Sequence, residues 1–263
     1  MAFELKLLLL SFSTSLIYAH CRPNQSSQLV KARLPPALDP NVGTSPPPYR
    51  PLPAGFYYGD WYVSYSSNKK YMALDNLIWS LWPVLPTCGL TLSSTPAECP
   101  LGTYPGQLAD LSTWTLNRTR KLYSAFGYDT PRRIANASLG RGWVDTWDTV
   151  GNGALSYFVN GWQILAWGWD GNGNGWMLNY ETAVLADGTP ACLDILSRVA
   201  GGPELGTVER IWRALEGLGS EELKTLKGEV RRMRVDGARK GLKPFVCGPD
   251  CRNNTDVGNA GNI

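Results

Sequence analysis

Residues 154–198 constrain the fold more than any other part of the sequence, because they read as four β-strands joined by tight turns. Asn160-Gly161 can form a type I′ hairpin turn, Gly171–Gly175 a longer turn, and Asp187-Gly188 marks a third. The segments between are rich in Trp, Tyr, Val, Ile and Leu, which suit a pleated, half-buried surface. A meander with two such apolar faces must close or be covered. We therefore predict an all-β fold, an up-and-down antiparallel β-barrel whose inner face is an aromatic pocket.

Further strands precede this meander. The stretch GFYYGDWYVSYSS alternates, with Trp61, Val63 and Tyr65 on one face, and is predicted to be the first strand. Four more are expected at 112–118, 120–128, 130–137 and 141–149. A total of about eight or nine strands closes a barrel just wide enough for one small ligand.

Composition limits the partners. The net charge is +3 and no basic stripe interleaves with aromatic residues, so nucleic acid is not an expected partner. The chain holds 11 Trp and 12 Tyr, which either fill a core or line a site for a flat, apolar ligand.

The N-terminus predicts entry into the secretory pathway. Residues 1–19 resemble a signal peptide, with Lys6 beside an apolar run that is too short for a membrane anchor. No later segment looks transmembrane. Residues 20–54 are a Pro-rich arm, expected to be ordered only where it lies against the body. Secretion, or delivery to a vesicle or vacuole, is the expected localisation.

Cysteines and glycosylation motifs agree with that route. The six cysteines allow 15 pairings and lack the spacing of a zinc site, so we expect disulfides; they are Cys21, Cys88, Cys99, Cys192, Cys247 and Cys251. Four Asn-x-Ser/Thr motifs predict N-glycans at Asn24, Asn117, Asn136 and Asn253.

Two regions depart from the strand pattern. Residues 67–111 are expected to form an insertion, in which MALDNLIWSLWPVLP is a short helix or a lid. Its Trp79, Leu81 and Trp82 either pack as a flap on the outside or cap a ligand mouth. After Arg198 the apolar period becomes helical over 204–217, and a second helix follows Ser220 and Glu222. The barrel with its C-terminal helices is expected to span 55–251, and 252–263 to be a disordered tail.

The residues missing from the sequence narrow the chemistry. The one histidine, His20, lies in the terminal arm, so a catalytic triad or a His-ligated metal is poorly supported. No phosphate-binding loop appears, because Gly171–Gly175 joins two strands and not a strand to a helix. We expect neither metal nor cofactor.

Candidate site residues follow from strand alternation. Trp143, Asp145 and Trp147 share one face, as do Leu165 and Trp167 on a later strand, and Tyr65 lies on the face of Trp61. Tyr157 and Tyr180 could project polar tips into the pocket. We predict Tyr157, Tyr180 and Asp145 as catalytic, and Tyr65, Trp143, Trp147, Leu165 and Trp167 as ligand-binding. For each aromatic residue, core packing is the alternative.

The chain resembles the lipocalins. The Gly-x-Trp signature of that family is present as Gly59-Asp60-Trp61, and Arg198 matches the arginine that stacks on the tryptophan at the end of the last strand. A helix follows, as in the family, here at 204–217. The resemblance covers 55–217 and implies a calycin barrel in which Trp61 and Arg198 are structural.

A narrower resemblance is to fungal, glycosylated hetero-Diels–Alderases of tropolone–sesquiterpene assembly. It rests on length, signal peptide, sequons and the Trp-rich body. It implies a cofactor-free cycloaddition between a tropolone quinone methide and a humulene-type alkene, with assistance to the loss of water that forms the quinone methide. The alternatives are a secreted lipocalin that carries a small hydrophobic ligand, such as a terpenoid, or a carbohydrate-binding surface protein with exposed Trp.

Overall fold

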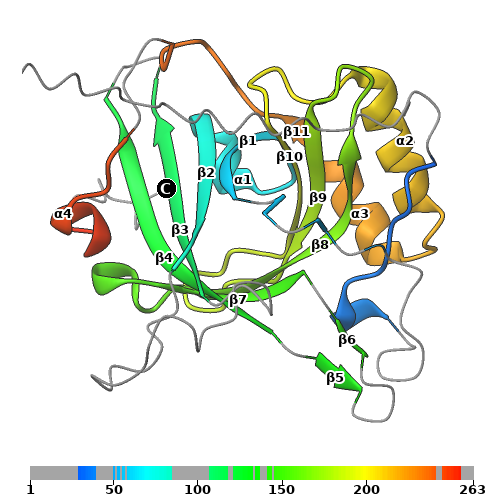
Figure 1. The fold of residues 1–263 in the computed structure, drawn as a ribbon, viewed down its shortest axis with the longest axis horizontal. Helices are drawn as coiled ribbons and strands as arrows, with labels where there is room; N and C mark the ends of the chain where they lie inside the picture. The colour runs from blue at the N-terminus through cyan, green and yellow to red at the C-terminus, as the bar shows by residue number, and fades with distance from the viewer. Residues whose placement is uncertain are drawn as a thin grey trace, which may run out of the picture.

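The computed structural model describes residues 29–39, 50, 52–53, 55–56, 58–84, 107–117, 121–132, 134–136, 141–143, 145–240 and 245–255. It confirms the closed barrel: eight antiparallel strands follow one another around the wall, and β10 pairs with β1 to close it (Figure 1). The eight strands are β1 Gly59–Ser66, β2 Asp75–Pro83, β3 Leu108–Thr115, β4 Tyr123–Pro131, β7 Thr146–Gly151, β8 Val159–Trp169, β9 Gly175–Glu181 and β10 Cys192–Ser197. The predicted up-and-down order is therefore correct.

Several short strands and helices lie outside the eight barrel strands. The hairpin of β5 (Ile134–Asn136) and β6 (Arg141–Trp143) forms a separate two-stranded sheet, and β11 (Arg231–Arg232) adds to β1. Helix α1 (Lys69–Met72) joins β1 to β2, and the 3-10 turns η1 and η3 cover Pro36–Leu38 and Gly153–Leu155. Helix α4 (Pro249–Arg252) ends the described chain. No helix among the described residues is long and apolar enough to cross a membrane.

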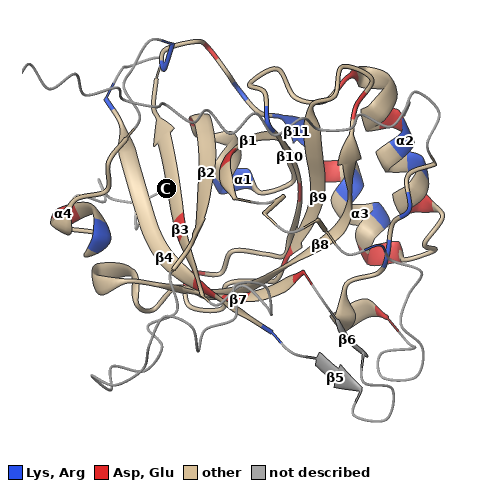
Figure 2. Cartoon of the chain, in the orientation of Figure 1, with Lys and Arg blue, Asp and Glu red and all other residues tan. Residues whose placement is uncertain are grey.

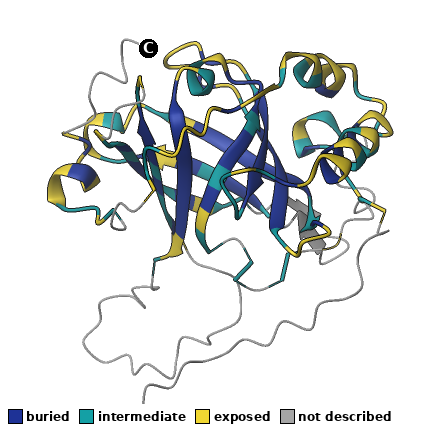
Figure 3. Cartoon of the chain, turned by 90° about the horizontal axis from the view of Figure 1, so that it is seen from above, coloured by how far each residue is buried: buried dark blue, intermediate teal, exposed yellow. Residues whose placement is uncertain are grey.

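The two predicted C-terminal helices are confirmed as α2 (Leu205–Glu216) and α3 (Glu221–Glu229), which lie together on one side of the barrel (Figure 1). Ser220 caps α3 by accepting a hydrogen bond from the Leu223 amide at 3.3 Å. Val208, Ile211 and Leu215 bury the apolar face of α2 against the outer faces of β8, β9 and β10. Burial of one such side chain contributes about 1.5–3 kcal/mol. The outer faces of both helices are exposed (Figure 3).

Strand alternation separates an inner from an outer cluster. On β9, Met177 belongs to the inner cluster, whereas Leu178 and Tyr180 belong to the outer cluster beneath α2 and α3. Two β-bulges reverse this alternation, one between Val63 and Tyr65 and one between Ile164 and Ala166. Simple alternation does not register such a shift, and both bulges affect predicted ligand-binding residues.

The expected helix or lid in residues 72–86 is wrong, because this stretch contains strand β2. Seven consecutive residues, Asp75 to Leu81, are buried, so the strand lacks the polar side that marks a half-exposed strand. Trp79 and Leu81 lie in the inner cluster and Trp82 is exposed. The neighbouring Cys88 and Cys99 lie outside the described residues.

The N-terminal arm packs against the barrel where it is described. The amide of Arg33 donates to the Leu165 carbonyl at 3.0 Å, and its guanidinium donates to the Ile164 carbonyl at 2.9 Å. These contacts lie at the β8 bulge. At the other end of the chain, Asn254 is buried and its side chain bonds the backbone of Phe126. Asn254, within the predicted tail 252–263, is thus hydrogen-bonded to β4, and residues 256–263 lie outside the described residues.

Candidate functional site

A cavity of about 170 Å³ lies at the end of the barrel that carries α1, the β7–β8 hairpin and the β9–β10 connection. Trp79, Trp114 and Trp162 form much of its wall, and Leu77 and Ala125 add aliphatic surface. Tyr157, half exposed, stands at the rim. Such a hollow suits a flat or cyclic apolar ligand.

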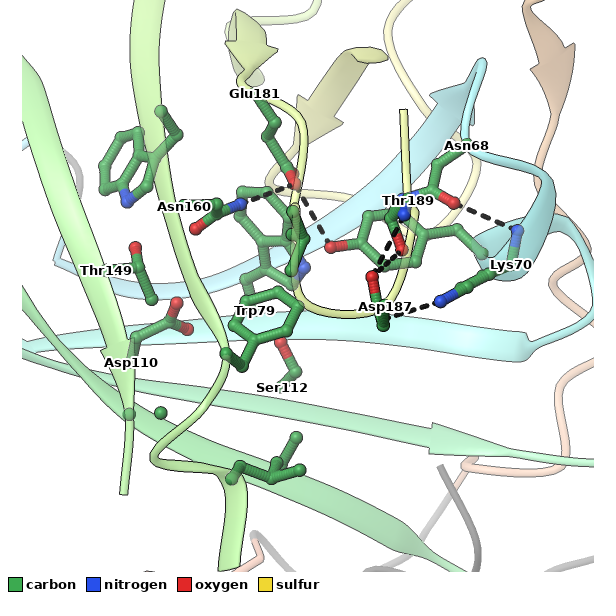
Figure 4. A pocket seen from close by; sticks show the side chains of 18 of the residues that line it. Asn68, Lys70, Trp79, Asp110, Ser112, Thr149, Asn160, Glu181, Asp187 and Thr189 are labelled. Atoms are coloured by element: carbon green, nitrogen blue, oxygen red, sulfur yellow. Dashed lines mark hydrogen bonds and ion pairs between the residues drawn. The ribbon is translucent and has the colours of Figure 1, made fainter. Parts of the chain in front are cut away.

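Polar groups enter the cavity from several elements (Figure 4). Glu181 ends β9, and its Oε2 atom accepts hydrogen bonds from the Tyr71 hydroxyl and the Asn160 side-chain amide, each at 3.3 Å. Asp110 comes from β3. These side chains can orient an oxygenated ligand within an otherwise apolar space.

Burial shifts the acid–base balance of these groups. Burial, followed by the charge of Asp194, raises the pKa of Glu181 well above its ordinary value. Burial, followed by the charge of Asp129, does the same to the pKa of Asp110. The pKa of Asp129 is raised to about 7, mainly by burial. Loss of water around a carboxylate disfavours the charged form, so these acids tend to hold their protons.

The rim carries an ion pair. Lys70 of α1 contacts Asp187 of the β9–β10 connection at 2.6 Å, and both side chains are about one-third exposed. Asn68 caps α1 by accepting from the Lys70 amide at 2.9 Å. The pair links two segments across the mouth. Elsewhere the barrel strands carry few charges, whereas α2 and α3 carry both signs (Figure 2).

The opposite end of the barrel is closed as the Gly-x-Trp and arginine pattern predicts. The guanidinium of Arg198 lies 3.7 Å from the centroid of the Trp61 ring. It also donates to the carbonyl oxygens of Asp60 and Tyr58, each at 2.8 Å, and to that of Phe56. Trp61 is fully buried. The structural role assigned to both residues is confirmed.

Of the residues predicted from alternation, Tyr157 lines the cavity but three others face outward. Tyr180, a predicted catalytic residue, donates to Glu222 of α3 at 2.8 Å, outside the barrel wall. Tyr65 and Leu165, predicted to bind ligand, lie in the outer cluster. The β1 bulge turns Tyr65 away from the face of Trp61, and the β8 bulge puts Leu165 and Trp167 on opposite faces. These three placements correct the prediction.

Asp145 and the neighbouring tryptophans also differ from expectation. Asp145 has a φ of 56°, which interrupts the expected strand 141–149, and its carboxylate accepts from the Leu52 amide at 3.1 Å. It fixes the arm and does not line the cavity. Trp147 is buried inside and stacks on Trp162 at 5.6 Å, behind the cavity wall. Trp167 lies outside the cavity, where its indole N–H donates to the Arg50 carbonyl at 2.7 Å. Trp143 is in β6, in the hairpin apart from the barrel.

The cysteine predictions are partly confirmed. Cys247 and Cys251 form a disulfide. Cys192 is a free, buried thiol on the inner side of β10, which contradicts its predicted disulfide. Cys21 lies outside the described residues. Asn117 and Asn253 are exposed, Asn136 is in β5, and Asn24 lies outside the described residues, so glycosylation at all four stays a prediction.

The Glu181 region has one further feature. Glu181, Cys192 and Asp194 bring two carboxylate oxygens and a sulfur within 4.8 Å of one another, a spacing that an ion would fit. Both carboxyl groups are buried, and Glu181 Oε1 and Asp194 Oδ1 accept no hydrogen bond from a described residue. Sequence reasoning missed Glu181 and Asp110 because acidic residues on strands are ordinarily solvent-facing. The period of β9, which places Glu181 on the face of Met177, was the available signal.

No family model matches the sequence. The chain is 30% identical over 212 residues to the botcinic acid biosynthesis cluster B protein 12 of Botryotinia fuckeliana (strain B05.10), covering 79% of this chain and 85% of that protein. Solved structures that resemble it include apocrustacyanin A1 of lobster, at 13% identity over 79% of this chain and 92% of that one, with a TM-score of 0.42. Insecticyanin of the tobacco hornworm Manduca sexta is 10% identical over 71% of this chain and 82% of that one, with a TM-score of 0.42. The protein is an eight-stranded up-and-down barrel with the Trp61–Arg198 contact that the lipocalin resemblance implies, and it belongs to the same family as the Botryotinia fuckeliana cluster protein.

Proposed function

We propose that the protein is a cofactor-free pericyclase that unites a tropolone quinone methide and a humulene-type sesquiterpene by an intermolecular hetero-Diels–Alder [4+2] cycloaddition. The observation that carries the proposal is the aromatic cavity inside the barrel, with its polar side chains gathered around Glu181. The family relative is named for a biosynthetic gene cluster, which supports a role in making a small molecule rather than only storing one.

The cycloaddition needs little from the protein beyond holding the two substrates in position. One C–C and one C–O bond form as the heterodiene adds to the alkene, giving a dihydropyran ring without loss of any atom. Holding both partners in a reactive geometry can supply about 7–11 kcal/mol of the barrier. A hydrogen bond from Tyr71 or from a neutral carboxyl group to the quinone-methide oxygen lowers the energy of the electron-poor partner and selects one face. The Trp79 and Trp162 rings would supply flat apolar walls.

We place the reaction in the secretory pathway or a vacuole, because residues 1–19 resemble a signal peptide and the acceptor residues of two glycosylation motifs, Asn117 and Asn253, are exposed. The second candidate function is transport of a small apolar ligand. It is favoured by the Lys70–Asp187 ion pair, which links two segments across the cavity mouth and would slow the escape of a bound molecule.

The test is to incubate purified glycoprotein with a quinone-methide source and the alkene, and to measure adduct formation and the ratio of stereoisomers by chiral chromatography. The pericyclase should raise the rate and shift the ratio relative to buffer. A tightly bound ligand with an unchanged rate and an unchanged stereoisomer ratio would support transport as the function instead.

Filling the cavity tests where the reaction occurs. Ser112 lines the cavity from β3, so Ser112→Trp should abolish both the acceleration and the stereochemical bias by occupying the ligand volume. Val150→Trp places the same side chain at a position on β7 that is 43% exposed and should leave both intact. A Ser112→Trp protein that melts normally and retains full activity would place the reaction elsewhere.

A further inference from the structure

A second cavity, of about 280 Å³, lies between the N-terminal arm, the end of β8 and the start of α2 (Figure 1). We call it the arm pocket. Its described lining residues include three tryptophans and three cations, which are Trp167, Trp169, Trp176, Lys31, Arg50 and Arg210. It shares no described lining residue with the cavity inside the barrel. The arm pocket is therefore a separate place where a ligand could bind.

The arm forms one side of this pocket because β7 does not accompany β8 to its end. The pairing between β7 and β8 ends at Gln163, whereas β8 continues to Trp169. The arm meets β8 beyond that point, where the Trp167 indole N–H donates to the Arg50 carbonyl at 2.7 Å. The rings of Trp167 and Trp169 lie edge to face, with their centroids 5.4 Å apart. Two neighbouring indoles are thus fixed at the end of β8, beside the arm.

The third tryptophan brings a hydrogen-bond donor that has no acceptor. Trp176 is 3% exposed, and its indole N–H has no hydrogen-bond partner among the described residues. The ring lies against Gly168, which also lines the arm pocket: a Cβ atom at that glycine would be 2.9 Å from the ring and 3.4 Å from Nε1. A buried N–H without an acceptor is unfavourable, because it has lost its hydrogen bond to water. An oxygen atom of a ligand in the pocket could supply the missing acceptor.

The charge of the arm pocket is positive. None of its described lining residues is acidic, and Lys31, Arg50 and Arg210 form no ion pair with a described residue. The guanidinium of Arg210 donates to the Thr207 hydroxyl at 2.7 Å. That of Arg50 lies 5.2 Å from the centroid of the Trp167 ring. The start of α2 adds the partial positive charge of a helix N-terminus. Cations gathered around indole rings favour a ligand that is both flat and negatively charged.

We propose that the arm pocket binds a small planar anion, an aromatic or enolic ring that carries one acidic oxygen group. The ring would pack against the indoles of Trp167 and Trp169, which offer flat apolar surface. The acidic oxygen would accept from the guanidinium of Arg210 and from the Trp176 indole N–H. An uncharged ligand of the same shape would leave the cations without a partner and should bind more weakly. This inference does not rest on the proposed cycloaddition, because the two cavities are separate.

The experiment titrates the full-length glycoprotein with two fluorescent probes. Anilinonaphthalene sulfonate is an aromatic anion, and phenylnaphthylamine has the same rings without the sulfonate group. Ser112→Trp fills the cavity inside the barrel and so removes binding there. The Ser112→Trp protein should still bind the sulfonate, and the affinity should fall as the salt concentration rises. It should bind the uncharged amine at least about tenfold more weakly, because the amine makes no charged hydrogen bond.

A pair of arginine variants on α2 locates the anion. Arg210→Met, made in the Ser112→Trp protein, removes one cation from the arm pocket and should raise the Kd of the sulfonate about tenfold or more. Arg210→Lys keeps the charge and should recover part of the affinity. Arg213→Met removes the same charge from an exposed position of the same helix and should change the Kd less than about twofold. Melting curves confirm that each variant is folded.

The outcomes decide between the two cavities. Sulfonate binding that survives Ser112→Trp and is lost with Arg210→Met would establish the arm pocket, whether or not the protein catalyses the cycloaddition. Three results would each overturn it: no sulfonate binding in the Ser112→Trp protein, equal affinity of that protein for the sulfonate and the amine, or equal effects of Arg210→Met and Arg213→Met. A protein without cycloaddition activity that passes these binding tests would refute only the pericyclase.

Discussion

Arg198→Ala is expected to lower the free energy of unfolding by at least about 3 kcal/mol, because hydrogen bonds from a charged group contribute about 1.5–3 kcal/mol each and three carbonyl oxygens lose their donor. The contact with the Trp61 ring is lost as well. Burial lowers the pKa of Arg198 to about 10, so the side chain is still charged at neutral pH. Urea unfolding followed by tryptophan fluorescence measures the change.

Two variants sharpen this result. Arg198→Lys keeps the charge but loses the planar group that stacks on the ring, and should recover less than half of the loss. Arg213→Ala removes an exposed arginine from α2 and should change stability by less than about 0.5 kcal/mol. Equal effects of Arg198→Ala and Arg213→Ala would mean that the floor of the barrel is not held by this contact.

The second large effect is a loss of stability as pH rises. The pKa of Asp129 is raised from 3.8 to about 7 in the folded protein, so between these values the folded state keeps a proton that the unfolded state has released. The stabilisation is complete below the unfolded pKa and disappears as pH rises through about 7. At 1.36 kcal/mol per pKa unit, Asp129 alone accounts for about 4 kcal/mol across this window.

Asp129→Asn should therefore flatten the profile and stabilise the protein at pH 8. The amide keeps an oxygen that can accept from Thr149, which donates to Asp129 Oδ1 at 2.5 Å. Unfolding measured from pH 4 to 8 in wild type, in this variant and in the exposed control Glu209→Gln tests the expectation. A wild-type protein that becomes more stable towards pH 8 would contradict it.

Much of the fold could be predicted from local pattern. The predicted turn at Gly171–Gly175 joins β8 to β9, because glycine adopts the backbone angles that such a turn needs. The turn predicted at Asn160-Gly161 is wrong, because both residues lie inside β8 and pair with Thr149 and Asp148 of β7. The Gly59-x-Trp61 pattern with Arg198 predicted that the start of β1 and the residue after β10 lie together at one end of the barrel. The period change after Arg198 indicated α2. The turn and the period change come from residues whose geometry is set by their near neighbours in sequence, whereas the Trp61–Arg198 contact joins distant parts of the chain and was predicted from the family resemblance.

The site was less predictable because it depends on registry and enclosure. A single extra residue in β1 turns Tyr65 outward, and another in β8 puts Leu165 and Trp167 on opposite faces. Nothing in the alternation marks where a bulge falls. β2 was misread because both its faces are buried, which removes the period of two. Glu181 and Asp110 gain their significance only once the wall closes around them and excludes water, and sequence spacing does not express that.

The seam between β1 and β10 has a consequence for synthesis. On that seam Tyr62 of β1 pairs with Ser197 of β10. One edge of β1 therefore stays unpaired until nearly all the barrel strands have been synthesised. During that interval its tryptophan-rich inner surface faces water, a state prone to sticking to other nascent chains. Folding of this protein should accordingly depend on chaperones that shield the incomplete sheet. A chain truncated before β10 should aggregate and not form a smaller barrel.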